Sequence, residues 1–425
     1  MRIRKSTNFF LKSYVFLFIF LSTRMWGLYS YTKIPLYVDT FSIISIMAVS
    51  VLYAIVIIFK AGGYVRIKKK VLPLLISILV VAFVEIFNTM KINSEQSVWY
   101  TIVEASFYFS IPVVYFVFSS IIKSKQDFAW LERAFCIAAV ALSCTSIFQR
   151  LVYKTIEIFP SEVNSLRNGE PRVFIGGSVV FTIGYLLLVH NFLRTRVNIK
   201  TILELSICLF RVVWAEQQRA FAIILLGVFA FFFIRARIEN KSLRIVLYVF
   251  LLVIGLFVSI LSDFAGSLQQ VFAGDMSASA RIWSMEFFIR KAKEYPVLGM
   301  GFIATSNDVG SLSYRILRND AGYLAQRSDV GLFGLLNMWG IVGLAWYMWL
   351  LSFFYKEAKT HGGETSIASV ILLYCLLTSF TLIITDAQRV LLIPVFMAIV
   401  QQEEWSEPNE CDIFENKPYR SRPPR

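Results

Sequence analysis

The sequence predicts an all-α integral membrane protein. The chain has 425 residues, of which 57% are hydrophobic, and its mean hydropathy is +0.64. Its 39 phenylalanines exceed what one soluble domain could bury in its core. Apolar runs of roughly 15 to 24 residues recur about twelve times, and each is close to the length of a helix that crosses about 30 Å of hydrocarbon.

These runs define about twelve expected transmembrane helices. They lie near residues 13–30, 40–59, 71–89, 99–122, 130–148, 173–191, 201–215, 219–234, 245–262, 331–355, 366–385 and 388–401. No small-residue cleavage site follows the first run, so we expect a retained span and not a removed signal peptide. The short seventh and eighth runs could instead form a re-entrant hairpin.

The basic residues predict the orientation of these spans. Arg2, Arg4, Lys5 and Lys12 place the N-terminus in the cytoplasm by the positive-inside rule, and every strongly basic short loop then falls on that side. The formal charge of +14 therefore indicates membrane orientation and not nucleic-acid binding. Spans one to nine would occupy residues 1–262 and the last three residues 331–401, with a disordered cytoplasmic tail over 402–425.

The interval 263–330 is the only long polar stretch, and we expect it to be external and functional. Residues 279–294 suit an amphipathic helix on the membrane surface, with Ile282, Met285 and Ile289 on one side and Trp283 and Phe287 dipping inward. Beyond the helix, Gly299 and Gly301 permit a turn whose N–H groups could receive an anion, although an ordinary turn is the commoner meaning of such a pair.

Ionisable residues gather near the outer ends of the expected spans: Glu85, Glu104, Arg211, Glu216, Arg219, Asp386 and Arg389. Charges at this depth are costly unless they face a wet cavity or one another, so they mark a functional site or a set of structural pairs. Further basic residues lie on the same face: Arg150, Arg167, Arg172, Arg281, Arg290, Lys291, Lys293, Arg315, Arg318 and Arg327. Arginine suits phosphate because its planar fork donates two parallel hydrogen bonds.

No pattern in the sequence indicates a metal or a cofactor. The five cysteines are scattered and match neither disulfide nor zinc spacing. The first outer loop holds Asp39 alone and offers no paired carboxylates for a metal.

Four motifs follow one another along the second half of the chain. They are Gln-Gln-Arg219-Ala-Phe-Ala, Ser-Ala-Arg281-Ile-Trp283, Pro296-Val-Leu-Gly299-Met-Gly301 and the stretch from Asp329 through Trp-Gly340-Ile-Val-Gly343. In this order they resemble the bacterial O-antigen ligase and polymerase superfamily, over about Arg211 to Leu350. The resemblance implies a GT-C-like, metal-independent glycosyltransferase. Such an enzyme works at the outer face of the cytoplasmic (inner) membrane and takes glycan from undecaprenyl diphosphate.

The resemblance also implies residue roles and partners. Arg219 and Arg281 would grip the diphosphate, with Arg211, Arg290, Gly299 and Gly301 as further binding candidates. The preferred base for the acceptor hydroxyl is Asp329, followed by Asp386 or Glu216. Expected partners are the lipid-linked donor and acceptor, membrane lipids, a chain-length regulator and a flippase.

Three functions fit the sequence. Ligases of the superfamily typically carry a histidine in the outer loop before the Gly-rich span, but His190 and His361 fall at cytoplasmic ends. A repeat-unit polymerase of the Wzy type is therefore favoured over a ligase that transfers glycan to lipid A core. A transporter or flippase of lipid-linked oligosaccharide is the alternative of another class, and it should show related halves and charges near the bilayer midplane.

Overall fold

The structure is a computed structural model that describes residues 2–28, 38–60, 69–94, 96–153, 156, 166–167, 170–194, 198–249, 277–303, 327, 330–360 and 366–402. Over these residues the regular secondary structure is helical apart from one pair of two-residue strands, and turns and irregular segments connect the helices. The two strands are β1 (Leu166–Arg167) and β2 (Glu170–Pro171), which pair antiparallel.

The longer helices are α1 (Arg2–Ser22), α2 (Val38–Lys60), α3 (Leu72–Ile92), α4 (Val98–Ile121), α5 (Lys125–Val152), α6 (Ser178–Arg194), α7 (Ile199–Phe210), α8 (Arg219–Arg237), α10 (Ser277–Glu294), α12 (Leu332–Thr360), α13 (Ile367–Thr378) and α14 (Leu392–Val400). A π-helical turn, η2 (Arg211–Ala215), continues α7. Among the described residues, six helices are long and apolar enough to cross a membrane: α2, α3, α4, α5, α8 and α12. The prediction of an α-helical, multi-pass membrane protein is confirmed at this level.

Local sequence signals set several helix starts. Ser97, Ser124 and Ser366 precede α4, α5 and α13, and each hydroxyl accepts a hydrogen bond from a backbone N–H in the first turn, at 3.1 to 3.3 Å. Such caps satisfy N–H groups that have no partner within the helix. Pro73 stands in the first turn of α3, where its missing N–H costs no intrahelical bond.

The expected spans overlap described helices throughout, except that most of 245–262 lies outside the described residues. Residues 241–249 are helical. Two boundaries were wrong. The first helix ends at Ser22 and not near residue 30, because residues 24–27 all have positive φ. Near the C-terminus, the turns at 379–391 separate α13 from α14, so both helices are shorter than the expected spans 366–385 and 388–401.

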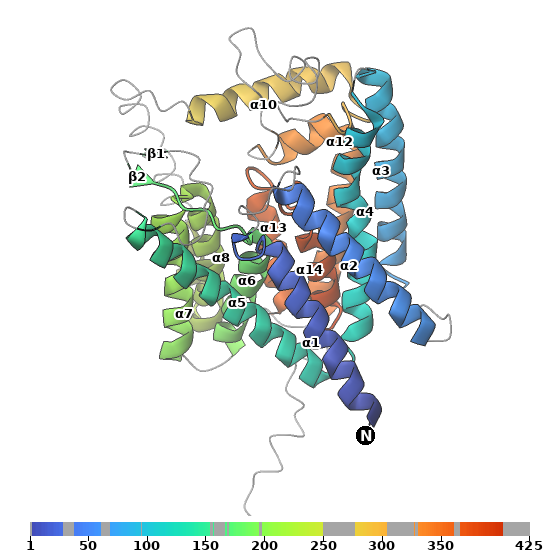
Figure 1. Ribbon diagram of the computed structural model, residues 1–425. Coiled ribbons are helices and arrows are strands. Elements are labelled where there is room, and N and C mark those ends of the chain that lie inside the picture. Colours follow the sequence, from blue (N-terminus) through green and yellow to red (C-terminus); the bar gives the residue numbers. More distant parts are fainter. Residues whose placement is uncertain are drawn as a thin grey trace, which may run out of the picture.

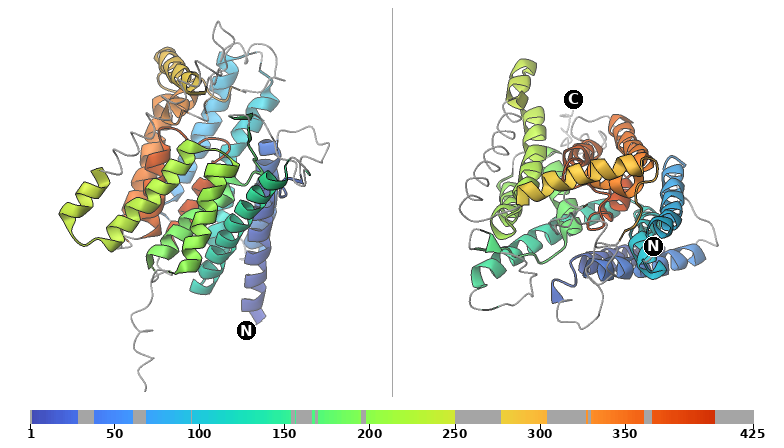
Figure 2. Two further views of the ribbon diagram at one scale, coloured as in Figure 1. Left: turned by 90° about the vertical axis from the view of Figure 1, so that its left-hand side faces the viewer. Right: turned by 90° about the horizontal axis from the view of Figure 1, so that it is seen from above.

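Figure 1 shows a bundle in which α3, α4 and α12 lie on one side and α5 to α8 on the other, with α13 and α14 between them. The helix α10 lies across one end of the bundle, as the turned views also show (Figure 2). We call this the α10 end. The opposite end is the one at which α1 begins.

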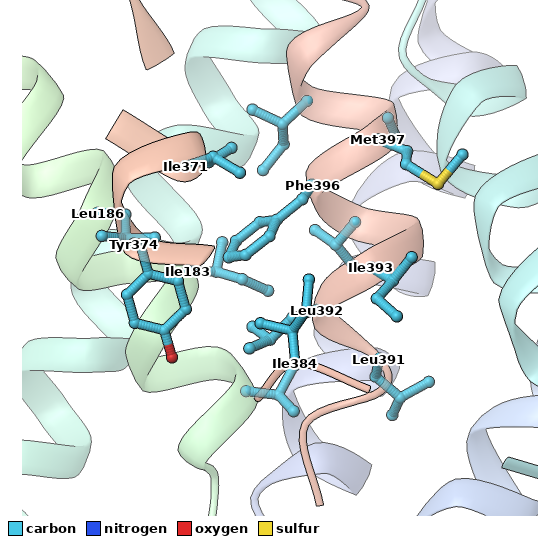
Figure 3. Packing of buried hydrophobic residues seen from close by; sticks show 14 of the residues in the cluster. Ile183, Leu186, Ile371, Tyr374, Ile384, Leu391, Leu392, Ile393, Phe396 and Met397 are labelled. Atoms are coloured by element: carbon cyan, nitrogen blue, oxygen red, sulfur yellow. The ribbon is translucent and has the colours of Figure 1, made fainter. Parts of the chain in front are cut away.

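The core of the bundle surrounds α14. Every residue from Leu392 to Val400 is buried, and Phe396 packs against Tyr374 of α13 with ring centroids 6.1 Å apart. Figure 3 shows this packing together with Ile183 and Leu186 of α6. This nine-residue helix is buried along its whole length and contacts α4, α6 and α13.

The helix α10 forms where the amphipathic helix was expected, but its buried face differs in part. Ser284, Phe287 and Phe288 are buried, whereas Ile282 and Ile289 are exposed by 59% and 42%. The burial of Phe287 agrees with the expectation. The two phenylalanines pack in a small cluster with Met300, Ile303 and Val330. The inner face of α10 is therefore set by contacts with the segment that follows it.

That segment fits into a break in α12. Gly340 has φ 58° and ψ −150°, which interrupts the helix. The carbonyls of Asn337 and Met338 accept hydrogen bonds from the N–H groups of Met300 and Gly301 at 2.7 and 2.8 Å. Past the break, Ile341 and Val342 donate to the carbonyls of Pro296 and Val297, at 2.9 and 3.2 Å. The chain at 296–301 thus satisfies backbone groups that the break leaves without helical partners.

Candidate functional site: two charged clusters at the α10 end

The first cluster, which we call the arginine cluster, comprises Arg24, Arg150, Arg172, Arg211 and Glu216. These residues come from the turn after α1, the last turn of α5, the strand-to-helix segment before α6, and η2 with the residue that follows it. Among the described residues, four arginines and one acidic residue therefore gather here.

Arg211 and Glu216 form the buried centre of this cluster. The Arg211 Nη2 and Nε atoms lie 2.6 and 2.9 Å from Glu216 Oε1, and the side chains are only 2% and 6% exposed. Arg211 Nη2 also donates to the carbonyl of Gly176 at 3.2 Å, and the guanidinium stacks on the ring of Phe181. Its Nη1 atom is buried and has no hydrogen-bond partner among the described residues.

Arg150 binds the backbone of the same turn. Its Nη1 donates to the carbonyl of Trp214 at 2.6 Å, and its guanidinium lies 4.7 Å from the centre of the Trp214 ring. The amide of Gln217, with its oxygen turned toward Arg150, accepts at 2.9 Å. Gln217 has φ 53°, a conformation that a residue other than glycine keeps only where its surroundings enforce it.

Arg172 and Arg24 complete the cluster. Arg172 Nε donates to the backbone carbonyl of Glu216 at 3.1 Å, and the Arg24 side chain lies against Gly176. Among the described residues, this cluster holds four arginines and one acidic side chain, so basic residues predominate in it.

The second cluster, the mixed-charge cluster, comprises Arg327, Glu85, Glu104, Asp386 and Arg389. Its centre is Arg327, which lies just before α12. The Arg327 Nε donates to Asn337 Oδ1 at 2.9 Å, and its Nη1 donates to the carbonyls of Gly301 and Ile303 at 3.1 and 3.4 Å. Burial lowers the pKa of Arg327 to about 10, although Glu104, Tyr108 and Glu85 oppose this shift. Arg327 therefore stays charged at neutral pH.

Glu85 and Glu104 interact electrostatically with Arg327, and Asp386 interacts with Glu104. Glu85 of α3 is buried and accepts from Asn88 at 2.9 Å, and Asp386 pairs with Arg389 at 3.0 Å. Glu104 of α4 is a half-buried carboxylate of this cluster, and it makes no hydrogen bond to a described residue.

A small cavity lies between the start of α6 and the turn before α14. Its volume is about 30 Å³, and its lining includes Ser178, two residues after Gly176, and Gln388, which lies between Asp386 and Arg389. This space suits roughly one water molecule.

The residues expected to bind diphosphate are distributed over this end. Arg219 is exposed and is the first residue of α8. The positive end of the helix dipole repels a cation at this position, and a bound anion would offset that repulsion. Arg281 is half-buried on α10, which crosses the same end (Figure 1). No contact between Arg219 and Arg281 is present among the described residues. Arg290 is exposed and lies over the ring of Phe287.

Other expected site residues have structural partners or are not described. Arg211 and Glu216 are paired with each other. The N–H groups of Gly299 and Gly301 donate to the carbonyls of Tyr295 and Met338, so neither is free for an anion here. Asp329 lies outside the described residues.

The sequence pattern does not indicate the central place of Arg327, the contribution of Arg24 or the interaction of Glu104 with Arg327. Arg327 and Glu104 are more than 200 positions apart, so no local spacing indicates their interaction. One signal was present, because Glu104 belongs to the set of charges expected near outer span ends.

Histidine and metal sites give no competing centre in the described part of the chain. His190 lies 3.7 Å from Glu132 at the end opposite α10, and His361 lies outside the described residues. No group of three His, Cys, Asp or Glu side chains within the described ranges is arranged to hold a metal ion.

In comparisons with known proteins, no protein-family model matches the sequence, and no curated protein is significantly similar to it.

Proposed function

We propose that this chain is a glycosyltransferase that joins undecaprenyl-diphosphate-linked oligosaccharide repeat units into a surface polysaccharide. It would have about twelve membrane spans in a GT-C-like arrangement and act at the outer face of a bacterial cytoplasmic membrane. The observation that supports this most is the arginine cluster, which in the described part of the chain brings four arginines and one acidic side chain together at the end that α10 covers. The order of the Arg219, Arg281 and Gly340 motifs supports the same class.

The arginines suit the departure of a diphosphate. The acceptor hydroxyl oxygen attacks the anomeric carbon of the donor sugar, and the bond from that carbon to the diphosphate oxygen breaks. The electron pair stays on the diphosphate, whose negative charge grows. Fixed guanidinium groups stabilise this charge without reorganising. Arg219 is the leading contact, because it is exposed at the N-terminus of α8, with Arg281 as its counterpart on α10.

A carboxylate must take the proton of the attacking hydroxyl. Glu216 is less suited than the sequence indicated, because it is buried against Arg211, and Asp386 is paired with Arg389. Glu104 makes no hydrogen bond to a described residue and lies near Arg327. We therefore add Glu104 to Asp329 as a candidate base.

The charge distribution favours this function over the alternatives. A flippase should carry its charges near the bilayer midplane, whereas the two clusters lie at one end of the bundle. A ligase of the resembled superfamily would use a histidine in the outer loop, and His190 lies at the other end.

Deletion and complementation test the proposal. In a strain that lacks the gene, the surface glycan should contain single repeat units, and the wild-type gene should restore a ladder of long chains. Arg219→Ala and Arg281→Ala should each fail to restore it while reaching the membrane at wild-type level.

Three outcomes would contradict parts of the proposal. Unchanged chain length in the deletion strain would exclude a polymerase. Long chains stranded on the carrier lipid would indicate a ligase. Normal ladders from both arginine variants would remove these residues from the site.

A further inference from the structure

A second cavity lies at the opposite end of the bundle, between the start of α3 and the end of α12. Its volume is about 670 Å³, which lies within the range of small-molecule sites. Lys70, Lys356 and Lys359 form its basic side, and Leu74, Trp349 and Phe353 form its apolar side. The cavity is remote from both charged clusters described above.

The charges of this cavity are unbalanced. Glu357 is its acidic lining residue, and its Oε1 atom lies 3.4 Å from Lys70 Nζ. Glu357 is 4% exposed, so it is held by the protein and does not extend to the other lysines. Lys356 and Lys359 have no ion-pair partner among the described residues. Two positive charges therefore remain available to an anion.

The apolar side identifies the kind of anion. Trp349 is 44% exposed, and Leu72 and Ile76 on the neighbouring helix are 40% and 51% exposed. Tryptophan favours the boundary between headgroups and hydrocarbon. A ligand that fills the cavity would place an anion on the lysines and a chain along α3. Free phosphate would contact the lysines but would leave the apolar side of the cavity uncovered.

We propose that this cavity binds the phosphate headgroup of an anionic phospholipid, with Lys356 and Lys359 on the phosphate and an acyl chain against Trp349. Basic pockets between transmembrane helices on the cytoplasmic side commonly bind such headgroups. The positive-inside pattern predicts that this end faces the cytoplasm. The proposal stands apart from the glycosyltransferase activity and does not depend on it.

Native mass spectrometry of the full chain in detergent tests the proposal, with phosphatidylglycerol as the anionic probe and phosphatidylcholine as the neutral one. The wild type should retain phosphatidylglycerol preferentially. The double variant Lys356→Gln/Lys359→Gln should bind it about 25-fold more weakly, because each lysine near an anionic lipid contributes roughly fivefold. The double variant Lys123→Gln/Lys241→Gln is the control, since it removes two exposed lysines outside the cavity.

A second readout locates the acyl chain. Brominated phosphatidylglycerol should quench the tryptophan fluorescence of the wild type more than that of Trp349→Phe. Equal retention of the two lipids, equal weakening in the control variant, or displacement of phosphatidylglycerol by equimolar inorganic phosphate would each overturn the proposal.

Discussion

The backbones of Gly299 and Gly340 lie in direct contact, and both residues have positive φ, 69° and 58°. A Cβ atom on Gly299 would lie 2.7 Å from the Gly340 nitrogen, and a Cβ on Gly340 would lie 2.7 Å from the Gly299 nitrogen. Neither position has room for a side chain. This contact joins the motif after α10 to the motif in the middle of α12, and the joined segments carry the carbonyls that hold Arg327.

Replacing either glycine should therefore destabilise the protein severely. In Gly340→Ala, the strain of a non-glycine residue at positive φ adds to the collision with the backbone at Val297. We expect a loss of at least about 3 kcal/mol. Thermal unfolding in detergent, followed by tryptophan fluorescence, measures the change.

Gly227→Ala is the matched control. Gly227 lies within α8, and a Cβ there would meet only Leu377 Cδ1, at 3.7 Å. Because alanine favours a helix more than glycine does, this variant should be as stable as the wild type or about 1 kcal/mol more stable. Equal melting temperatures for Gly340→Ala and Gly227→Ala would contradict the interlocked break.

The sequence predicted the helices well because hydropathy and length determine where a chain can cross a membrane. It did not predict the break in α12. Residues around Gly340 are apolar, so the stretch reads as one continuous span. The break is stable because residues 296–301 supply the missing backbone hydrogen bonds. Those partners come from another part of the chain, and no local pattern reveals them.

The gathering of charges near span ends was predictable, but their pairing was not. The sequence predicts ionisable residues near the ends of several spans, and both clusters contain such residues. Their pairing followed from the fold. Arg211 was expected to bind a ligand, yet it lies against Glu216, five residues away, because η2 brings both side chains inward. Likewise, Phe287 and Phe288 of α10 pack with Met300 and Ile303 of the segment that follows, which a helical pattern alone does not show.

The Arg211 and Glu216 pair allows a test of buried electrostatics. Glu216→Gln leaves the Arg211 charge without its counterion in a site that is nearly inaccessible to water, so we expect a loss of about 3–5 kcal/mol of stability. The double variant Arg211→Met/Glu216→Gln removes the stranded charge and should recover part of that loss. Thermal unfolding of both variants and the wild type measures the difference.

Glu204→Gln serves as the control for that pair. Glu204 lies 3.8 Å from Lys200, and its side chain is 26% exposed, so its removal should change stability by less than about 1 kcal/mol. If Glu216→Gln were as stable as Glu204→Gln, the buried pair would not contribute to the fold as inferred.

Arg150 tests the arginine cluster without removing its buried centre. Arg150→Gln takes away one of four guanidinium groups, and we expect chain extension to slow by roughly tenfold or more, because less charge remains to stabilise the leaving diphosphate. Arg150→Lys keeps the charge but cannot donate to the carbonyl of Trp214 and the Gln217 amide at the same time. Its activity should therefore lie between those of the wild type and Arg150→Gln. Glycan length in complemented cells measures the effect.

Arg194→Gln is the control for Arg150. Arg194 is exposed at the end of α6, opposite the cluster, and its loss changes the net charge by the same amount. Equal glycan lengths in Arg150→Gln and Arg194→Gln would indicate that the arginine cluster does not act on the substrate.

Glu104 tests the assignment of the base. Glu104→Gln keeps the shape of the side chain but cannot accept a proton, so we expect the rate of chain extension to fall by about 10²- to 10⁴-fold. Wild-type activity should decline as the pH falls, because the carboxylate must be ionised to act. The residual activity of Glu104→Gln should lack that decline.

Glu239→Gln is the control. It alters an exposed carboxylate beyond the far end of α8 and should keep both the rate and the pH profile. A Glu104→Gln variant with the wild-type pH profile would return the role to Asp329, whereas loss of the acidic limb together with the rate would place the proton transfer beside Arg327.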